Sequence, residues 1–116
     1  MAKALLQMQA SALQIRARLE YPETGILSKV LLGDENCQYM LFCLATGSKI
    51  AEHRAPRNAT IHVLEGSGKL TLNGQVISLE PGIFAVMPAR TPHALTAIEN
   101  LAFLLILSEP APPLRS

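Results

Sequence analysis

The sequence contains no tryptophan and few aromatic side chains of any kind, since two tyrosines and three phenylalanines make up only 4% of its 116 residues. Proteins that bind single-stranded nucleic acid commonly stack bases on aromatic side chains. Charge is also scarce, at 16% of residues, and ten basic side chains nearly balance nine acidic ones. No broad positive field is therefore available to attract phosphates or an anionic membrane surface. We expect partners other than nucleic acid and membranes.

Long apolar runs and paired cysteines are lacking as well. The nearest approach to a membrane span, residues 101–107, is far shorter than the ~20 residues that cross a bilayer. Gln7 and Gln9 interrupt the N-terminal apolar stretch before it could act as a signal peptide, so we expect a soluble, cytoplasmic protein. Cys37 and Cys43 lie on one expected strand, roughly 20 Å apart at about 3.3 Å per residue, which is too far for a disulfide.

The chain is instead rich in aliphatic side chains, with 49% apolar residues in a length typical of one domain. A domain of this size buries about two-thirds of the surface that its unfolded chain exposes. Folding therefore needs no metal ion or disulfide, and any metal bound here would serve function. From residue 20 onward, turn signals built from Gly, Pro, Asn and Ser recur at short intervals. This spacing predicts an all-β sandwich or barrel.

Seven segments between these turns are rich in β-branched or aliphatic residues and are expected to form strands. They are residues 26–32, 38–44, 60–64, 69–72, 75–79, 83–87 and 101–107. The strongest hairpin signal is Asn73 followed by Gly74, because a two-residue type I′ turn needs a positive φ at both positions.

The two ends of the chain differ from this pattern. Residues 1–19 contain no Gly or Pro, and their apolar positions fit either a helical stripe or a half-buried strand. Both alternatives remain open at this point, and the apolar surface predicts packing on the barrel or across a dimer. Residues 20–108 are expected to form the barrel, and residues 109–116 form a proline-rich tail that cannot extend a sheet.

Two consecutive segments carry a recognisable pair of motifs. Residues 47–74 read GSKIAEHRAPRNATIHVLEGSGKLTLNG, and residues 82–100 read GIFAVMPARTPHALTAIEN. They resemble the two motifs of the cupin superfamily, G-x5-H-x-H-x3,4-E-x6-G and G-x5-P-x-G-x2-H-x3-N. The matches are Gly47, His53 and the turn at Gly66 in the first motif, and Gly82, Pro88 and His93 in the second. The resemblance implies a small antiparallel jelly-roll barrel, or double-stranded β-helix.

The departures from the family pattern concern its metal site. Family metal sites use three histidines and one glutamate, and the corresponding positions here are His53, Ala55, Ala59 and His93. Two imidazoles remain, fewer than the three protein ligands of a typical catalytic zinc or iron site. A third ligand from Glu52 is disfavoured, because strand alternation directs it outward. The H-x-A-P string at residues 53–56 further resembles single-domain bacterial cupins that form dimeric barrels with reduced or absent metal sites, most of them without an assigned reaction.

Other polar residues are expected beside this pair. Arg54, Arg57 and Arg90 fall in or near the loops next to His53 and His93, where a guanidinium could bind a carboxylate or phosphate or simply remain solvated. His62 has the opposite strand parity and is expected at the surface or in a dimer interface. Cys37 and Cys43 share a parity that could direct both inward as small apolar side chains. Gln38 and Tyr39 could line the pocket, whereas Met40, Phe42, Phe84 and Met87 are expected in the core or an interface.

The sequence as a whole predicts a homodimeric cupin that binds a small polar or anionic ligand without assigned catalysis. The expected pocket residues are His53, His93, Arg54 and Arg90. No cofactor is expected, although His53 and His93 could hold a divalent metal ion. The alternative is a metal-dependent enzyme of the oxygenase or isomerase type in which these histidines are ligands. A third possibility is a structural partner protein whose pocket is vestigial.

Overall fold

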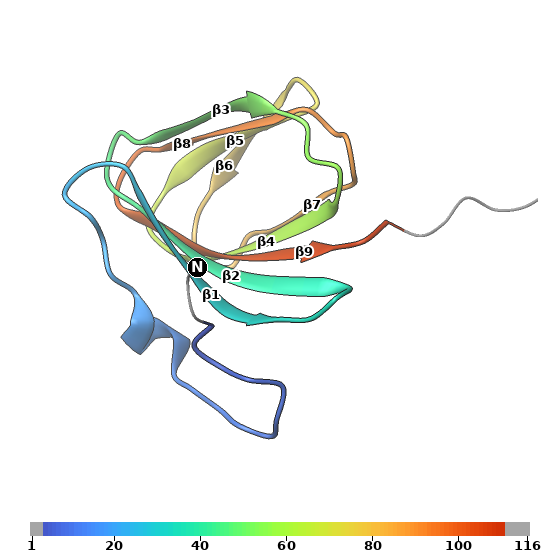
Figure 1. The fold of residues 1–116 in the computed structure, drawn as a ribbon. Helices are drawn as coiled ribbons and strands as arrows, with labels where there is room; N and C mark the ends of the chain where they lie inside the picture. Colours follow the sequence, from blue (N-terminus) through green and yellow to red (C-terminus); the bar gives the residue numbers. More distant parts are fainter. Residues whose placement is uncertain (1–3, 111–116) are drawn as a thin grey trace, which may run out of the picture.

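A computed structural model describes residues 4–110 of the chain as two antiparallel sheets that face each other and close into a barrel (Figure 1). The first sheet has the order β1-β2-β9-β4-β7 and the second the order β3-β8-β5-β6. The strand bounds are β1 Ile26–Gly33, β2 Cys37–Leu44, β3 Lys49–His53, β4 Asn58–Glu65, β5 Gly68–Leu72, β6 Gln75–Leu79, β7 Phe84–Met87, β8 His93–Ala97 and β9 Leu101–Ser108. The expected all-β jelly-roll barrel is confirmed. In the part of the chain that is described, no helix is long and apolar enough to cross a membrane.

The hairpin between β5 and β6 forms as its sequence indicates. Leu72 pairs with Gln75, which leaves Asn73 and Gly74 as the two turn residues. Their φ angles are 50° and 83°, so both lie in the left-handed region that a type I′ turn requires. Each of the seven expected strand segments is a strand in the structure, with bounds that differ by a residue or two at the ends.

Two strands of the structure were not among these seven segments, because their apolar and polar residues do not alternate clearly in the sequence. They are β3, which ends at His53, and β8, which begins at His93. β8 lies between β3 and β5, so its backbone is paired on both sides. Pairing of His53 with His93 brings together two residues forty positions apart in sequence. These two strands therefore position the residues of greatest functional interest.

The main core fills the space between the two sheets. The first sheet contributes Leu44, Ile61, Val63, Leu101 and Phe103, and the second contributes Leu70, Leu79, Leu95 and Ala97. Phe42 and Phe103 stack with their ring centroids 5.3 Å apart. Because adjacent residues on a strand point to opposite faces, every second residue of these strands enters this core.

Residues 5–21, called here the N-terminal strap, lie outside the barrel against its first sheet (Figure 1). Neither of the two alternatives for this region is correct, because it contains only a four-residue 3-10 helix at Ile15–Arg18. The backbone N–H groups of Leu5 and Leu6 donate to β1 carbonyls, and Ile15 and Leu19 pack on the outer face of the sheet. Two backbone hydrogen bonds and the packing of apolar side chains therefore attach the strap, without a continuous backbone ladder. Residues 111–116 of the expected tail lie outside the described residues.

Polar contacts hold the strap at two points. The Tyr21 hydroxyl donates to the Glu65 carboxylate, and Arg16 lies 3.6 Å from the other Glu65 oxygen. Lys29 Nζ donates at 3.0 Å both to Glu20 Oε1 and to the carbonyl of Arg18. Each contact joins a strap side chain or carbonyl to a sheet residue, so the strap is a positioned part of the fold.

The Tyr21 contact predicts a pH dependence of stability. Partial burial, followed by the hydrogen bond to Glu65, raises the pKa of Tyr21 above its usual value of 10.0. A raised pKa means that the folded state holds this proton more tightly than the unfolded state does. The stabilisation is therefore complete below pH 10 and declines as the pH rises above it. The urea midpoint should fall more steeply above pH 10 in the wild type than in Tyr21→Phe, and parallel curves would contradict the prediction.

Cys43 corrects one expectation from strand parity. It is buried, with 1% of its surface exposed, but it packs with Leu31, Leu41 and Ala102 beneath the strap and does not point into the barrel. Burial raises the pKa of its thiol, which disfavours the reactive thiolate. Cys37 lies on the same strand and is half-buried, and both cysteines are free. The parity that the two cysteines share is therefore that of the outer face of the sheet. Cys43 is buried there because the strap covers this part of the face.

Candidate functional site

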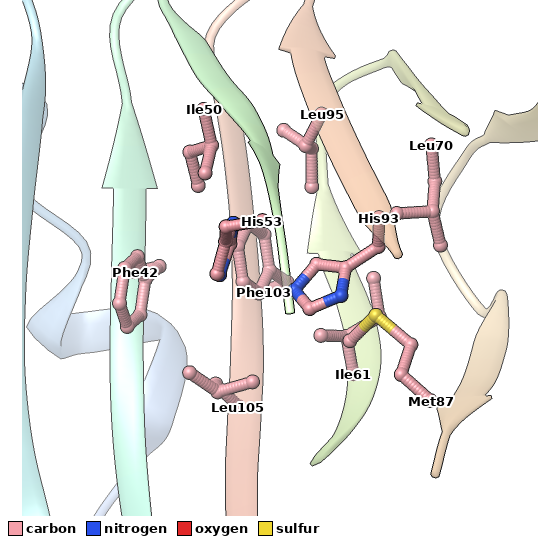
Figure 2. A pocket seen from close by; sticks show the side chains of 10 residues that line it. All are labelled: Phe42, Ile50, His53, Ile61, Leu70, Met87, His93, Leu95, Phe103 and Leu105. Atoms are coloured by element: carbon pink, nitrogen blue, oxygen red, sulfur yellow. The ribbon is translucent and has the colours of Figure 1, made fainter. Parts of the chain in front are cut away.

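One end of the barrel interior holds a cavity of about 160 Å³ between the two sheets (Figure 2). The first sheet supplies half of its lining and the second sheet the other half. The lining residues are Phe42, Ile61, Met87, Phe103 and Leu105 from the first sheet, and Ile50, His53, Leu70, His93 and Leu95 from the second. Eight of these ten side chains are hydrocarbon or thioether, so the polar groups of the lining side chains are confined to the two histidines.

A bulge in β3 places His53 at this wall. Ile50 pairs with Leu95 and His53 pairs with His93, so three residue steps on β3 match two on β8. An extra residue in one strand resets the alternation of its side chains. Ile50 and His53 would otherwise point to opposite faces, yet both line the cavity. Glu52, whose side chain was expected to point outward, is exposed and does not line it.

The two imidazole rings form one polar patch. Their centroids are 4.2 Å apart and their planes meet at 62°, so the rings contact each other edge to face (Figure 2). His53 is exposed whereas His93 is half-buried, which places His53 nearer to solvent. A molecule that enters the cavity from the His53 side therefore passes the histidine pair before it reaches the hydrocarbon wall.

Backbone carbonyl groups determine which nitrogen of each ring carries a proton. Nδ1 of His53 lies 3.0 Å from the carbonyl oxygen of Ala51, and Nδ1 of His93 lies 2.9 Å from that of Thr91. A carbonyl oxygen can only accept a hydrogen bond, so Nδ1 is the donor in both rings. In the neutral imidazole the proton-free nitrogen is then Nε2. The site thus presents two hydrogen-bond acceptors, neither of which has a partner among residues 4–110.

The donor set does not fit a metal centre of the kind that the family pattern implies. Ala59 is buried in the main core with 3% of its surface exposed, and Ala55 lies in the loop after β3, where its carbonyl accepts from the Arg90 backbone N–H. Within the described part of the chain, no three His, Cys, Asp or Glu side chains are grouped so that they could hold a metal ion. Two imidazoles fall short of the three protein ligands of a typical catalytic site.

The arginines expected in the pocket do not line it. Arg54 and Arg90 are exposed, and neither belongs to the cavity wall. Arg90 adopts a φ of 69° at the position where the family pattern has glycine, in a turn whose backbone is tied to Ala55. Arg57 is half-buried, lies 3.1 Å from Glu109 through its Nε, and donates to Gln38 at 3.4 Å. None of the three arginines therefore provides a positive charge in the cavity wall for an anionic ligand.

Several wall residues were missed as ligand contacts because they looked like ordinary core. Phe42 and Met87 were expected in the core or an interface, and both border the cavity. Tyr39 faces the strap side of the sheet, in the cluster that contains Leu41 and Cys43. Phe42 and Tyr39 occupy alternate positions of β2 and so point to opposite faces of the sheet. Strand alternation was the only signal that could have placed Phe42 at the cavity and Tyr39 under the strap. His62 is exposed on the outer face, as its parity predicted.

A comparison with protein families matches residues 40–107 to the cupin domain. The matched range begins within β2 and ends within β9, and it includes all of the cavity-lining residues. No protein of curated function matches the sequence significantly.

Solved structures with the same architecture include three bacterial proteins. A conserved protein of unknown function from Streptococcus pyogenes is 26% identical, with a TM-score of 0.80 over 95% of this chain and 97% of that one. A cupin superfamily protein from Desulfitobacterium hafniense is 25% identical, with a TM-score of 0.81 over 95% and 99%. A cupin 2 conserved barrel domain protein from Leptotrichia buccalis is 35% identical, with a TM-score of 0.75 over 81% of this chain and 46% of that one.

Proposed function

The chain belongs to the cupin domain family, and from this premise we propose that it is a binding protein whose barrel cavity holds one small ligand. The observation that carries the proposal is the hydrocarbon wall of the cavity with a histidine pair on one side. An apolar pocket with a few polar groups that fix orientation is the usual design of a small-molecule site. The ligand has an apolar body and one polar group.

The cavity volume limits the size of the ligand. Sites for drug-sized molecules commonly measure about 300–1,000 Å³, whereas this cavity measures about 160 Å³. An engineered cavity of about 150 Å³ lined by Leu, Ile and Phe stays dry and binds benzene. The wall described above contains the same Leu, Ile and Phe side chains, with Met87 and the two histidines in addition. A molecule with a single six-membered ring therefore matches the space.

This proposal revises the polar or anionic ligand that the sequence predicted. None of the ten lining residues is an Asp, Glu, Lys or Arg. A carboxylate buried in the cavity without a cationic partner would lose its hydration with no compensation. The apolar wall instead favours a neutral ligand.

Toluene provides the first test of the cavity. We expect it to raise the melting temperature of the wild-type protein and to shift the amide resonances of residues around the cavity, because a ligand that binds only the folded state stabilises it. Ile50→Phe should fill part of the cavity and weaken toluene binding at least tenfold. Ile77→Phe is the matched control, because Ile77 is also half-buried against the core but does not border the cavity. Binding that survives in Ile50→Phe, or no binding in the wild type, would overturn the proposal.

Metal content separates this function from the metal-dependent enzyme. We expect less than one metal ion per chain in protein purified without chelators, and no uptake of Fe, Mn, Ni or Zn to stoichiometry, because only two imidazoles are grouped here. A stoichiometric metal ion that is lost in the double variant His53→Leu/His93→Leu would contradict the proposed binding protein and support the metal-dependent enzyme.

We further propose that two copies of the chain pair through the half of the first sheet that the strap leaves bare. On this bare face, Phe84 and Val86 of the edge strand β7 are 60% and 54% exposed and lie beside Thr60 and His62 of β4. None of these four residues is an Asp, Glu, Lys or Arg, so an identical copy can cover them without burying an unpaired charge. Twofold pairing of this kind requires a patch that is complementary to itself.

The mass in solution tests this pairing. Light scattering should give the mass of two chains for the wild type and of one chain for Phe84→Ser/Val86→Ser. The control is Val76→Ser, because Val76 is equally exposed, at 60%, but lies on β6 in the other sheet. A wild-type monomer, or a dimer that persists in the double variant, would contradict the proposed interface.

A further inference from the structure

The histidine pair constrains the chemistry of the ligand beyond its size. We infer that the ligand carries an uncharged hydrogen-bond donor, a hydroxyl or an aromatic amine, which Nε2 of His53 or Nε2 of His93 accepts. The ligand class is then a phenol or arylamine with a single ring. This inference rests on the proposed function, because it describes the polar group of the same cavity ligand.

The first step of the argument is that both rings are held in the same tautomer. Each Nδ1–H donates to a carbonyl two residues earlier on its own chain segment, Ala51 for His53 and Thr91 for His93. These bonds turn the rings and commit their protons, so a ligand meets an acceptor on either ring. The centroid separation of 4.2 Å places the two rings side by side in the cavity wall.

The second step concerns the rest of the wall. The other eight lining side chains offer neither a donor nor an acceptor of normal strength, since they are aliphatic, aromatic or thioether groups. A ligand acceptor such as a carboxylate or ketone oxygen would therefore face lone pairs at the histidines and hydrocarbon elsewhere. An unmade hydrogen bond at a buried polar group costs about 1–3 kcal/mol. Only a donor on the ligand can form a hydrogen bond with a histidine acceptor in this cavity.

The third step excludes a fully charged donor. An ammonium group in this cavity would have no carboxylate beside it, because the wall contains no Asp or Glu. Burial of an unpaired charge is far more costly than burial of a hydroxyl that is hydrogen-bonded. A neutral hydroxyl or aromatic amine on a single ring is the group that remains.

Phenol, toluene and benzoate form a matched set of probes of one size. Water hydrates a hydroxyl better than a methyl group, so the decisive quantity is how each affinity changes when the acceptors are removed. In His53→Leu/His93→Leu we expect phenol affinity to fall at least tenfold and toluene affinity to change less than threefold. Benzoate should not bind the wild-type cavity at pH 8. Thermal unfolding of each variant verifies that it is folded.

His62→Leu is the matched control for the loss of a histidine. His62 lies on the outer face of β4 and is not part of the cavity wall. Its replacement should leave the affinities for phenol and toluene unchanged. A drop in phenol affinity in this variant as large as in the double variant would overturn the inference.

A spectroscopic measurement tests the tautomers directly. Nitrogen chemical shifts of the imidazole rings distinguish a protonated Nδ1 from a protonated Nε2, and we expect protonated Nδ1 in both His53 and His93. Protonated Nε2 in either ring would overturn the inference.

The outcomes distinguish the inference from the function on which it rests. If toluene binds and phenol and toluene respond alike to loss of the histidines, the ligand class is wrong and the cavity function stands. If benzoate binds more tightly than phenol, the class is again wrong. If no probe binds the wild type, both the function and the inference fail.

Discussion

Replacing Gly66 with alanine is expected to lower the free energy of unfolding by about 3 kcal/mol or more, because two independent penalties combine at this position. Gly66 has a φ of 91°, which side chains of L residues rarely adopt, and a Cβ atom here would lie 1.8 Å from the Asn100 carbonyl oxygen. Backbone atoms cannot rotate away as a flexible side chain could. The turn after β4 and the turn before β9 would have to separate.

Gly82→Ala is the matched control for this substitution. Gly82 has a similar φ of 96°, but a Cβ atom there would meet nothing within 4 Å. It should therefore show only the strain of a left-handed alanine, about 1–2 kcal/mol. Urea unfolding of the two variants measures the difference. If both lose the same stability, the contact with Asn100 does not limit this turn.

The position of Gly66 gives this prediction a wider meaning. Gly66 ends the first motif of the family pattern, and Asn100 binds Thr46 through its side chain at 2.9 Å and 3.1 Å. Gly66 lies in the turn between β4 and β5, and Asn100 lies in the turn between β8 and β9. Their close approach and the Asn100–Thr46 hydrogen bonds thus join these two turns to the loop before β3. A motif glycine that could suggest ligand contact is explained here by backbone packing at the end of the barrel.

Leu70→Ala is expected both to destabilise the protein and to enlarge the ligand space. Leu70 is 1% exposed, belongs to the main core and lines the cavity. Large-to-small replacements of buried leucine commonly cost about 2–5 kcal/mol. The removed volume joins the existing cavity, so a two-ring probe such as naphthalene should bind the variant at least tenfold more tightly than it binds the wild type.

Leu79→Ala separates these two effects. Leu79 is 2% exposed in the same core, but it does not border the cavity. Its replacement should therefore cost a similar amount of stability without admitting naphthalene. Calorimetry or ligand-detected NMR with both variants provides the comparison. Equal naphthalene affinity in the two variants would show that the cavity does not determine ligand size.

The fold and the meeting of His53 with His93 could both be predicted from the sequence. Regular turn signals separated the strands, and the Asn73–Gly74 pair defined its hairpin, because these features depend on local backbone preferences. The motif spacing correctly brought His53 and His93 together. Local chemistry and a known spacing were sufficient for these features.

Other features depend on contacts between distant segments and could not be predicted in this way. The bulge in β3 shifts the alternation between Ile50 and His53, and no residue within β3 marks it. Cys43 is buried on the outer face only because the strap crosses it. The arginines close to the histidines in sequence were expected in the pocket, but Arg54 and Arg90 are exposed and do not belong to its wall.

The sequence by itself determined an all-β barrel and a depleted metal site, because turn residues, aliphatic strands and two alanines in place of metal ligands are local properties of the chain. Its scarcity of charge and aromatic groups excluded nucleic acid from the expected partners. Only the tertiary structure decided what the pocket is made of. The wall is assembled from seven strands, and its polarity depends on which side chains the strand register and the β3 bulge turn inward. Here those side chains are eight hydrocarbon or thioether groups and two imidazoles.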